Sequence, residues 1–178
     1  MIIQVSKYLS LCIVICFITF CYQINNVYGN TYGKEQIEEF IQLTSNIRAE
    51  KAIEMFEEKH STIVYLPEDL PFKPTHRYGK VTNQGDLTLH FMRMFNKPHQ
   101  DIIIIILAPD RKIETFLSPV DNVLTLTDHS KAYIKTIDNY FNLLLFQKNG
   151  YGYIIGGNTN HIPKFNAEGL IEIADSIK

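Results

Sequence analysis

The strongest pattern in the chain is an unbroken apolar run, Ile102–Ile106, in which all five residues are isoleucine. Asp101 precedes this run, Leu107 follows it, and Pro98 and Pro109 bound the segment. A short β-branched run of this kind is typical of a strand that is buried on both faces of a sheet. An exposed strand of this composition would be prone to aggregate. We therefore expect other elements, with the N-terminal helix as the natural lid, to cover it.

Residues 33–60 have the period of an amphipathic helix, with apolar side chains on one side and glutamates on the other. The polar triplet at residues 44–46 interrupts the pattern, and Ser45 is suited to cap a helix N-terminus. The sequence therefore predicts either one long helix or two short ones. A row of glutamates is usually a solvated helix face, and we prefer that interpretation to a cation-binding or partner-binding surface.

Three prolines in residues 66–74 predict extended, loop-like chain, because proline removes a backbone donor and disfavours helix in the residue before it. We expect Leu66, Leu70 and Phe72 to pack across the domain.

From Tyr78 onward the pattern is mostly that of β-strands. The predicted strands cover residues 87–91 with a possible extension to 95, 101–107, 123–126, 131–137, 141–147 and 151–155. Asn149-Gly150 lies between the last two strands and is the strongest hairpin signal in the chain. A C-terminal helix is predicted from Ala167 to Ile177, with Asn166 as its N-cap. The fold class is therefore α+β: one or two N-terminal helices, an antiparallel β-meander of about six strands, and a C-terminal helix.

The N-terminal 29 residues have the parts of a secretory signal. Lys7 is their only charged residue, and the apolar run Tyr8–Tyr22 of 15 residues follows it. Val27 and Gly29 suit the −3 and −1 positions of a cleavage site before Asn30. A membrane-spanning helix needs about 20 apolar residues, so a cleaved signal is the first interpretation and an uncleaved membrane anchor is the second. Either way, the sequence predicts that residues 30–178 form a single extracytoplasmic domain, secreted or anchored to the cell membrane.

All three cysteines, Cys12, Cys16 and Cys21, lie within this leader. Phe20 stands before Cys21, where a lipoprotein signal needs a small residue, which argues against a lipid anchor. The mature chain would then have no disulfide, no thiol nucleophile and no cysteine-ligated zinc. An exported protein without disulfides is more typical of a bacterial envelope than of an animal secretory pathway.

The net charge of the chain argues against partners that are themselves strongly negative. Removing the leader takes away Lys7 and no acidic residue, so the formal net charge changes from −2 to −3 in the remaining 149 residues. The longest basic cluster is the pair Arg111-Lys112. Binding to nucleic acid or to an anionic membrane surface is therefore not expected.

No motif in the chain indicates catalysis. The glycines at positions 150, 152, 156 and 157 lie in and after a predicted hairpin, whereas a phosphate-binding loop leads directly into a helix. No pair of histidines has the close spacing of a metal site. The six histidines are His60, His76, His90, His99, His129 and His161. The nearest approaches to a site are His99 with Asp101 and Asp128 with His129, and both pairs fit polar turns. We expect no metal, no cofactor and no catalytic residue.

Aromatic side chains crowd the predicted C-terminal hairpin. Tyr133, Phe146, Tyr151 and Tyr153 are candidate ligand-binding residues, because an aromatic sheet face suits a lipid, a glycan or a peptide. The alternative is that they form core and cross-strand pairs, which stabilise a sheet by about 0.2–1 kcal/mol each.

Four segments resemble one family in order along the chain. They are YLPEDLPFKP (65–74), LTLTDHSKAY (124–133), LLFQKNGYGY (144–153) and GLIEIADSIK (169–178). Residues 60–178 are similar to an uncharacterised extracytoplasmic domain of Firmicutes, found in anti-sigma-factor-like and sporulation lipoprotein-like proteins. The resemblance implies a secreted or membrane-anchored domain, and some members resemble the sheet fold of lipoprotein carriers. It implies no catalytic residues. Two departures are His129, where such domains often have glycine, and Phe146, where tryptophan is usual.

Together these features predict a non-enzymatic, exported domain from a Gram-positive bacterium that binds, senses or scaffolds at the cell envelope. The expected partner is another envelope or membrane protein, or a small apolar ligand, and not nucleic acid. One alternative is an envelope hydrolase that uses Asp128, His129 or His99. Another is a purely structural envelope or spore protein without a ligand.

Overall fold

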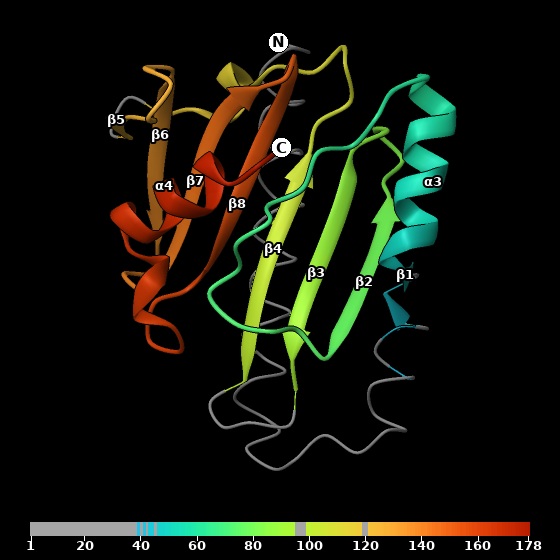
Figure 1. The fold of residues 1–178 in the computed structure, drawn as a ribbon, viewed down its shortest axis with the longest axis horizontal. Helices are drawn as coiled ribbons and strands as arrows, with labels where there is room; N and C mark the ends of the chain where they lie inside the picture. Colours follow the sequence, from blue (N-terminus) through green and yellow to red (C-terminus); the bar gives the residue numbers. More distant parts are fainter. Residues whose placement is uncertain (1–38, 40, 42, 45, 95–98, 119–120) are drawn as a thin grey trace, which may run out of the picture.

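The computed structural model describes residues 39, 41, 43–44, 46–94, 99–118 and 121–178. Within them, helices α3 (Ala49–His60) and α4 (Ala167–Asp175) accompany one antiparallel sheet of eight strands (Figure 1). The α+β prediction is therefore confirmed. The strands are β1 (Ile47–Arg48), β2 (His76–Val81), β3 (Leu87–Arg93), β4 (Gln100–Ile106), β5 (Asn122–Thr125), β6 (Lys131–Ile137), β7 (Phe141–Lys148) and β8 (Tyr151–Asn158). Two short 3-10 helices are η1 (Ile113–Phe116) and η2 (Pro163–Phe165).

The strand order in the sheet is β1-β2-β3-β4-β8-β7-β6-β5. The predicted single meander of about six strands is therefore wrong in its strand count and in its continuity. Two meanders meet where β4 pairs with β8, so that Ile104 lies opposite Ile155. A single meander would place β5 beside β4. Instead, β8 takes that place, and after β4 the chain crosses to β5 at the far edge of the sheet.

The position of the isoleucine run is as predicted. Ile102, Ile104 and Ile106 of β4 are buried in the main core, and Ile103 is buried on the opposite side of the strand. β4 therefore lies at the centre of the sheet with both of its faces shielded, which explains why its sequence shows no polar alternation.

Helix α3 is shorter than the helix predicted for residues 33–60, and it packs on different strands from the one we expected it to cover. Ile47 and Arg48 form strand β1 and pair with Gly79 and Tyr78, so α3 begins only at Ala49. No side chain caps its N-terminus, and the predicted cap Ser45 lies outside the described residues. Positions 39, 41 and 43 are helical as well, in agreement with an interruption near residues 44–46.

The helix packs against β2 and β3 and makes no comparable contact with β4. The prediction that it is the lid over the isoleucine strand is therefore wrong. Gly79 explains its close approach to β2. A Cβ atom at Gly79 would lie 2.6 Å from Leu89 Cδ2 and 3.2 Å from Ala52 Cβ on the helix. Only a residue without a side chain fits between the helix and the neighbouring strand. Ala52 and Phe56 are the side chains that α3 buries most completely.

An extended segment, residues 61–75, runs from α3 to β2 and crosses in front of β4 (Figure 1). We call it the strap. Phe72 is buried in the main core, and Leu66 and Leu70 pack against that core, as predicted from the proline-rich sequence. Pro67 forms an isolated bridge with Ile177 after the last helix. The strap therefore ties the two ends of the domain together.

The C-terminal part follows its local sequence signals. Asn149 and Gly150 have φ values of 50° and 82° in the turn between β7 and β8, as a two-residue hairpin of this kind requires. Asn166 caps α4, where its Oδ1 accepts a hydrogen bond from Gly169 N at 2.9 Å. Both predictions are confirmed, although α4 ends two residues before the predicted Ile177.

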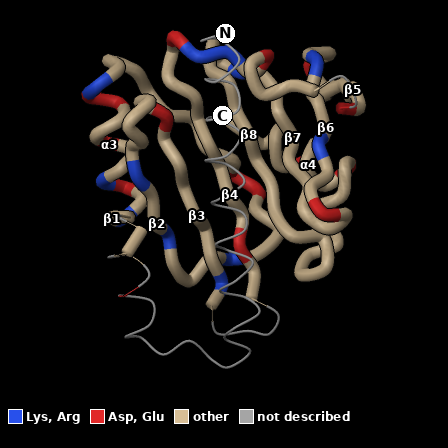
Figure 2. Tube along the Cα trace, turned by 180° about the vertical axis from the view of Figure 1, so that it is seen from behind, with Lys and Arg blue, Asp and Glu red and all other residues tan. Residues whose placement is uncertain are grey.

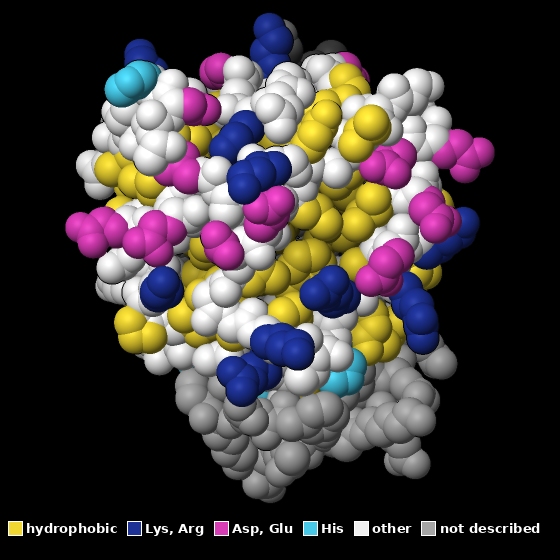
Figure 3. Space-filling model, in the orientation of Figure 1, with side chains coloured by type: hydrophobic (Ala, Val, Ile, Leu, Met, Phe, Trp, Pro, Cys, Tyr) yellow, Lys and Arg dark blue, Asp and Glu magenta, His cyan; other side chains and the backbone are white. Residues whose placement is uncertain are grey.

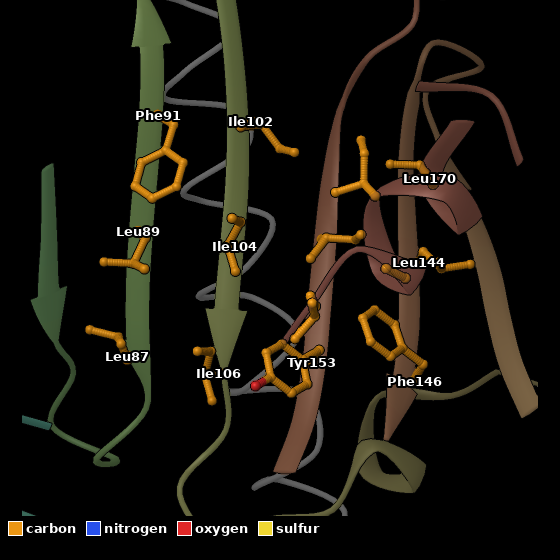
Figure 4. Close-up of a cluster of buried hydrophobic side chains, with 14 of the residues drawn as sticks. Leu87, Leu89, Phe91, Ile102, Ile104, Ile106, Leu144, Phe146, Tyr153 and Leu170 are labelled. Atoms are coloured by element: carbon orange, nitrogen blue, oxygen red, sulfur yellow. The ribbon is translucent and has the colours of Figure 1, made fainter. Parts of the chain in front are cut away.

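The helices and the strap pack on the same side of the sheet, which we call the first face; the opposite side is the second face. Side chains of the main core project from β3, β4, β7 and β8 onto the first face (Figure 4). On the molecular surface over this face, charged side chains are scattered across the view, and apolar atoms show between them (Figure 3). The first face is therefore closed by elements of the chain itself.

Candidate functional site

The first pair of predicted ligand-binding residues, Phe146 and Tyr153, lies inside the main core. The two residues are register partners on β7 and β8, and their rings stack with centroids 5.3 Å apart and planes at 9°. Both are 0% exposed. The Tyr153 hydroxyl donates a hydrogen bond to Tyr65 O at 3.1 Å, and burial raises the pKa of this hydroxyl well above its ordinary value. In this conformation neither ring has surface to offer a ligand.

The second pair, Tyr151 and Tyr133, lies on opposite faces. Tyr151 is half-buried on the first face, where its hydroxyl donates to Thr62 Oγ1 and its ring meets Phe56 edge-on at 6.4 Å. Tyr133 is the register partner of Leu145 and packs on the second face. The structure therefore brings Phe146, Tyr151 and Tyr153 to one face and Tyr133 to the other. Ligand binding at these residues remains a prediction.

The residues of the hydrolase alternative are not brought together. Asp128 and His129 are exposed in the turn between β5 and β6, and His129 has a φ of 65°. The Asp128 carboxylate accepts a hydrogen bond from Ser130 N at 2.9 Å, and its hydrogen bonds from Ser130 lower its pKa. This turn lies at the end of the sheet where β8 begins, whereas His99 precedes β4 at the end where β8 finishes.

A histidine–carboxylate pair that the sequence did not predict lies on the second face. His90 of β3 is 0% exposed, and its Nδ1 lies 3.3 Å from Asp101 Oδ2 of β4. The register pairs His90 with Ile103 and Asp101 with Met92, so the two side chains are diagonal neighbours. Alternation in β3 and β4 was the available signal, because it places both residues opposite the apolar stripe. A carboxylate beside Nδ1 fixes the orientation of the imidazole ring.

His99 has a different neighbour from the one that its spacing suggested. The His161 side chain forms a hydrogen bond with the backbone of His99, and burial lowers the pKa of His161. Asp101 pairs with His90 instead, so the structure does not join His99 and Asp101 in one site. Among the residues that the structure describes, no group of three or more His, Cys, Asp or Glu side chains is arranged to hold a metal ion.

The second face is apolar across four neighbouring strands, β4, β8, β7 and β6. Its apolar side chains are Ile103, Ile105, Tyr133, Ile137, Leu143, Leu145 and Ile154. The loop after β4 packs against it near β7 through Leu107, Ile113, Phe116 and Leu117. Figure 2 looks onto this face, and neither α3 nor α4 lies over it. The two sides of the sheet are therefore alike in apolar character but differ in the described elements that cover them.

Charged groups on the second face lie at its borders. The His90–Asp101 pair marks one end of the central strands. Lys135 of β6 lies at the side, where its Nζ donates to Phe116 O at 3.1 Å and stands 3.9 Å from Asp121 Oδ2. Strand β8 has no charged residue. An occupant lying along β4, β8 and β7 would therefore meet polar groups mainly at the two sides, on β3 and β6.

Comparison with known proteins finds no match to a family model, to a curated protein or to a solved structure. None of the helices among the described residues has the length and apolar character needed to cross a membrane.

Proposed function

We propose that this protein is an exported domain of the cell envelope that binds a small apolar ligand, an acyl chain, on the second face of its sheet. One observation carries the proposal: the second face is an apolar surface of four strands on which neither α3 nor α4 packs. An apolar sheet face needs a cover, and an apolar ligand can provide one where no helix does.

The dimensions and chemistry of the face favour an elongated ligand. A strand of seven residues such as β4 is about 23 Å long, and Ile103 and Ile105 follow one another along it on the second face. Leu143 and Leu145 run parallel to them on β7, with Ile154 of β8 between. Transfer of acyl methylenes from water to such a surface is favourable by about 0.8 kcal/mol per buried CH₂.

The exported location rests on the leader. Its apolar run follows Lys7 and precedes a cleavage-type sequence that ends at Gly29. The resemblance to an extracytoplasmic domain of Firmicutes agrees with this location and with a Gram-positive source. Fractionation of the expressing cell and N-terminal sequencing test it. A product in the medium or on the outer side of the membrane is expected, and a product confined to the cytoplasm would contradict it.

The hydrolase alternative receives less support from the geometry. Asp128 and His129 are solvent-exposed in one turn, and His99 lies at the other end of the sheet. A hydrolase that uses His129 would lose all turnover of its substrate in His129→Ala while keeping its fold, and acyl binding would not be affected.

The binding proposal is tested by titrating the full chain with a fluorescent fatty acid. Ile105→Asp places a carboxylate in the middle of the second face, and Met55→Asp places one on α3, where the side chain is 44% exposed. We expect saturable binding that Ile105→Asp weakens at least tenfold and Met55→Asp leaves unchanged. Circular dichroism verifies that both variants are folded. Tyr133→Ala, a milder change at the side of the same face, is expected to weaken binding by a smaller factor.

Equal affinity in Ile105→Asp and Met55→Asp would overturn the proposal, and so would the absence of saturable binding. Capture of an envelope protein that Ile105→Asp abolishes, without fatty-acid binding, would replace the small ligand with a protein partner on the same face.

A further inference from the structure

The two edges of the sheet differ in how the chain protects them. Strand β1 has two residues, one of them Arg48, and leads directly into α3. Strand β5 has four residues and no charge, and Figure 1 and Figure 2 show it at the opposite edge, beyond β6. Proteins commonly protect edge strands with charged residues, proline or very short length, because an open edge can pair with another chain. Of the two edges, β5 is therefore the one that can accept a further strand.

Register shows which backbone groups of β5 point away from the sheet. Leu126 N donates to Ser130 O at 3.0 Å across the turn, so the backbone polar groups of Leu126 face β6. These groups alternate between the two sides of an antiparallel strand, and Leu124 therefore faces β6 as well. The N–H and C=O groups of Val123 and Thr125 point outward. We call these two residues the edge window.

The chain itself uses the outward N–H groups on either side of the edge window. Asp121 N donates to Ser118 O at 3.1 Å, and Thr127 N donates to Asp175 Oδ1 at 3.2 Å. Among the described strands, β6 is the only one that pairs with β5. The Val123 side chain is 60% exposed. The open part of this edge is therefore limited to the edge window.

We infer that a second copy of this chain pairs its own β5 with this edge, antiparallel about a two-fold axis at Leu124. In that register, Val123 of each copy lies opposite Thr125 of the other, and each such pair exchanges two backbone N–H···O hydrogen bonds. A shift of two residues in either direction would place Asp121 or Thr127 opposite the edge window, where the N–H groups of both residues are already used. The hydrogen bonds of the chain itself therefore select one register.

The side chains are self-complementary in this register. Residues 122–127 include no charged residue, so no like charges meet along the new ladder. On the first face, Leu124 of each copy packs at the border of the main core, and the two leucines meet as a close non-hydrogen-bonded pair. On the second face, Val123 is the register partner of Tyr133 and gains Thr125 of the second copy as a neighbour.

A two-fold contact of this kind uses the same residues on both copies and closes as a dimer. Self-complementarity is the reason for choosing a second copy over an unrelated extended peptide. The dimer joins the two sheets edge to edge, so that their second faces become neighbours. This inference goes beyond the proposed function and does not depend on it.

Sedimentation of the full chain over a range of concentrations tests the dimer. The average mass should rise from 20.6 kDa toward twice that value. Val123→Pro removes an outward N–H that the pairing of β5 with β6 does not use, and should weaken the dimer at least tenfold in a folded protein. Val123→Thr keeps the N–H and the β-branched shape, and should dimerise like the unchanged chain. A mass that stays at 20.6 kDa, or equal association in the two variants, would overturn the inference.

Cysteine crosslinking tests the register without the proline variant. In the full chain with serine at Cys12, Cys16 and Cys21, Leu124→Cys places two thiols opposite each other, with Cα atoms about 4.5 Å apart, which a disulfide can span. Val123→Cys places a more exposed thiol about 7–8 Å from its symmetry mate. Mild oxidation should link Leu124→Cys into a covalent dimer several times faster than Val123→Cys. Equal linkage, or faster linkage of Val123→Cys, would overturn the inference.

Discussion

The two faces of the sheet differ in the elements that cover them, although both are apolar. On the first face, α3, the strap and α4 bury a single core that includes Phe56, Phe146, Tyr153 and Phe165. On the second face, the described cover is the loop around η1, which packs beside β7. A sheet with two apolar faces needs two covers. The described chain supplies the cover of the first face, whereas it covers the second face only in part.

The largest contrast between the faces is expected from aromatic truncation. Phe146→Ala removes a ring that is fully buried and stacked on Tyr153, and should lower the free energy of unfolding by about 3–5 kcal/mol. Tyr133→Ala removes a half-buried ring from the second face and should cost clearly less. Urea denaturation of both variants provides the measurement. Equal losses would mean that the second face is as much a part of the permanent core as the first.

Added methyl groups should show a smaller contrast of the same kind. Gly157→Ala places a Cβ atom 2.1 Å from the Phe165 ring on the first face. Gly152→Ala places one 2.8 Å from Ile113 Cγ2 and from Leu107 Cδ1 on the second face, where side chains of the loop can shift. We expect Gly157→Ala to destabilise by about 1–3 kcal/mol or more and Gly152→Ala to destabilise less. Thermal unfolding of the two variants measures both losses. A larger loss in Gly152→Ala than in Gly157→Ala would contradict the difference between the two faces.

Asp86 anchors the loop that covers part of the second face. It is buried, its Oδ1 accepts a hydrogen bond from Ala108 N at 2.9 Å, and its Oδ2 pairs with Arg111. The Arg111 guanidinium in turn lies 5.1 Å from the centre of the Phe116 ring. Asp86→Ala should cost about 1–3 kcal/mol, because Ala108 N and the Arg111 guanidinium both lose the acceptor that Asp86 provides. Hydrogen exchange around η1 should accelerate more than exchange in α4.

Asp86 should also make the stability of the fold depend on pH. Burial raises the pKa of Asp86, despite the opposing effects of the Ala108 hydrogen bond and the Arg111 charge. The folded protein therefore holds this proton more tightly than the unfolded chain does. The contribution of Asp86 to stability is largest below the ordinary aspartate pKa of about 4, and it decreases as pH rises through the raised value. Asp86→Asn should remove this part of the pH profile, and an unchanged profile would contradict the assignment.

The smallest expected effect is at the end of α4. Asn166→Ala removes the cap that accepts from Gly169 N and should cost about 1 kcal/mol. Asn166→Asp keeps an acceptor and should restore most of the loss. Because α4 covers the first face, neither change should alter fatty-acid binding on the second. A loss of binding in Asn166→Ala at full folding would break the separation of the two faces.

Local signals in the sequence predicted local structure. The hairpin at Asn149-Gly150, the cap at Asn166, the central strand at Ile102–Ile106 and the extended strap all depend on a few adjacent residues, and the structure confirms them. The strand order was not predictable in this way, because the pairing of β4 with β8 joins segments about 50 residues apart. Strand β1 has only two residues, too few to show a period.

The candidate site shows the same limit. Alternation places Tyr151 and Tyr153 on one face, but register is needed to add Phe146 and to send Tyr133 to the other. Register is also what joins His90 to Asp101. No pattern in the aromatic residues says which face the helices cover, and so the sequence directed attention to rings that lie in the core.

The most direct test of the two-face account is to label the full chain with a photoreactive fatty acid and to map the labelled peptides by mass spectrometry. The account predicts label in β4, β7 and β8, on second-face residues such as Ile105, Leu145 and Ile154, and competition by excess unlabelled fatty acid. Label confined to α3, the strap or α4, or label that competitor does not reduce, would contradict it.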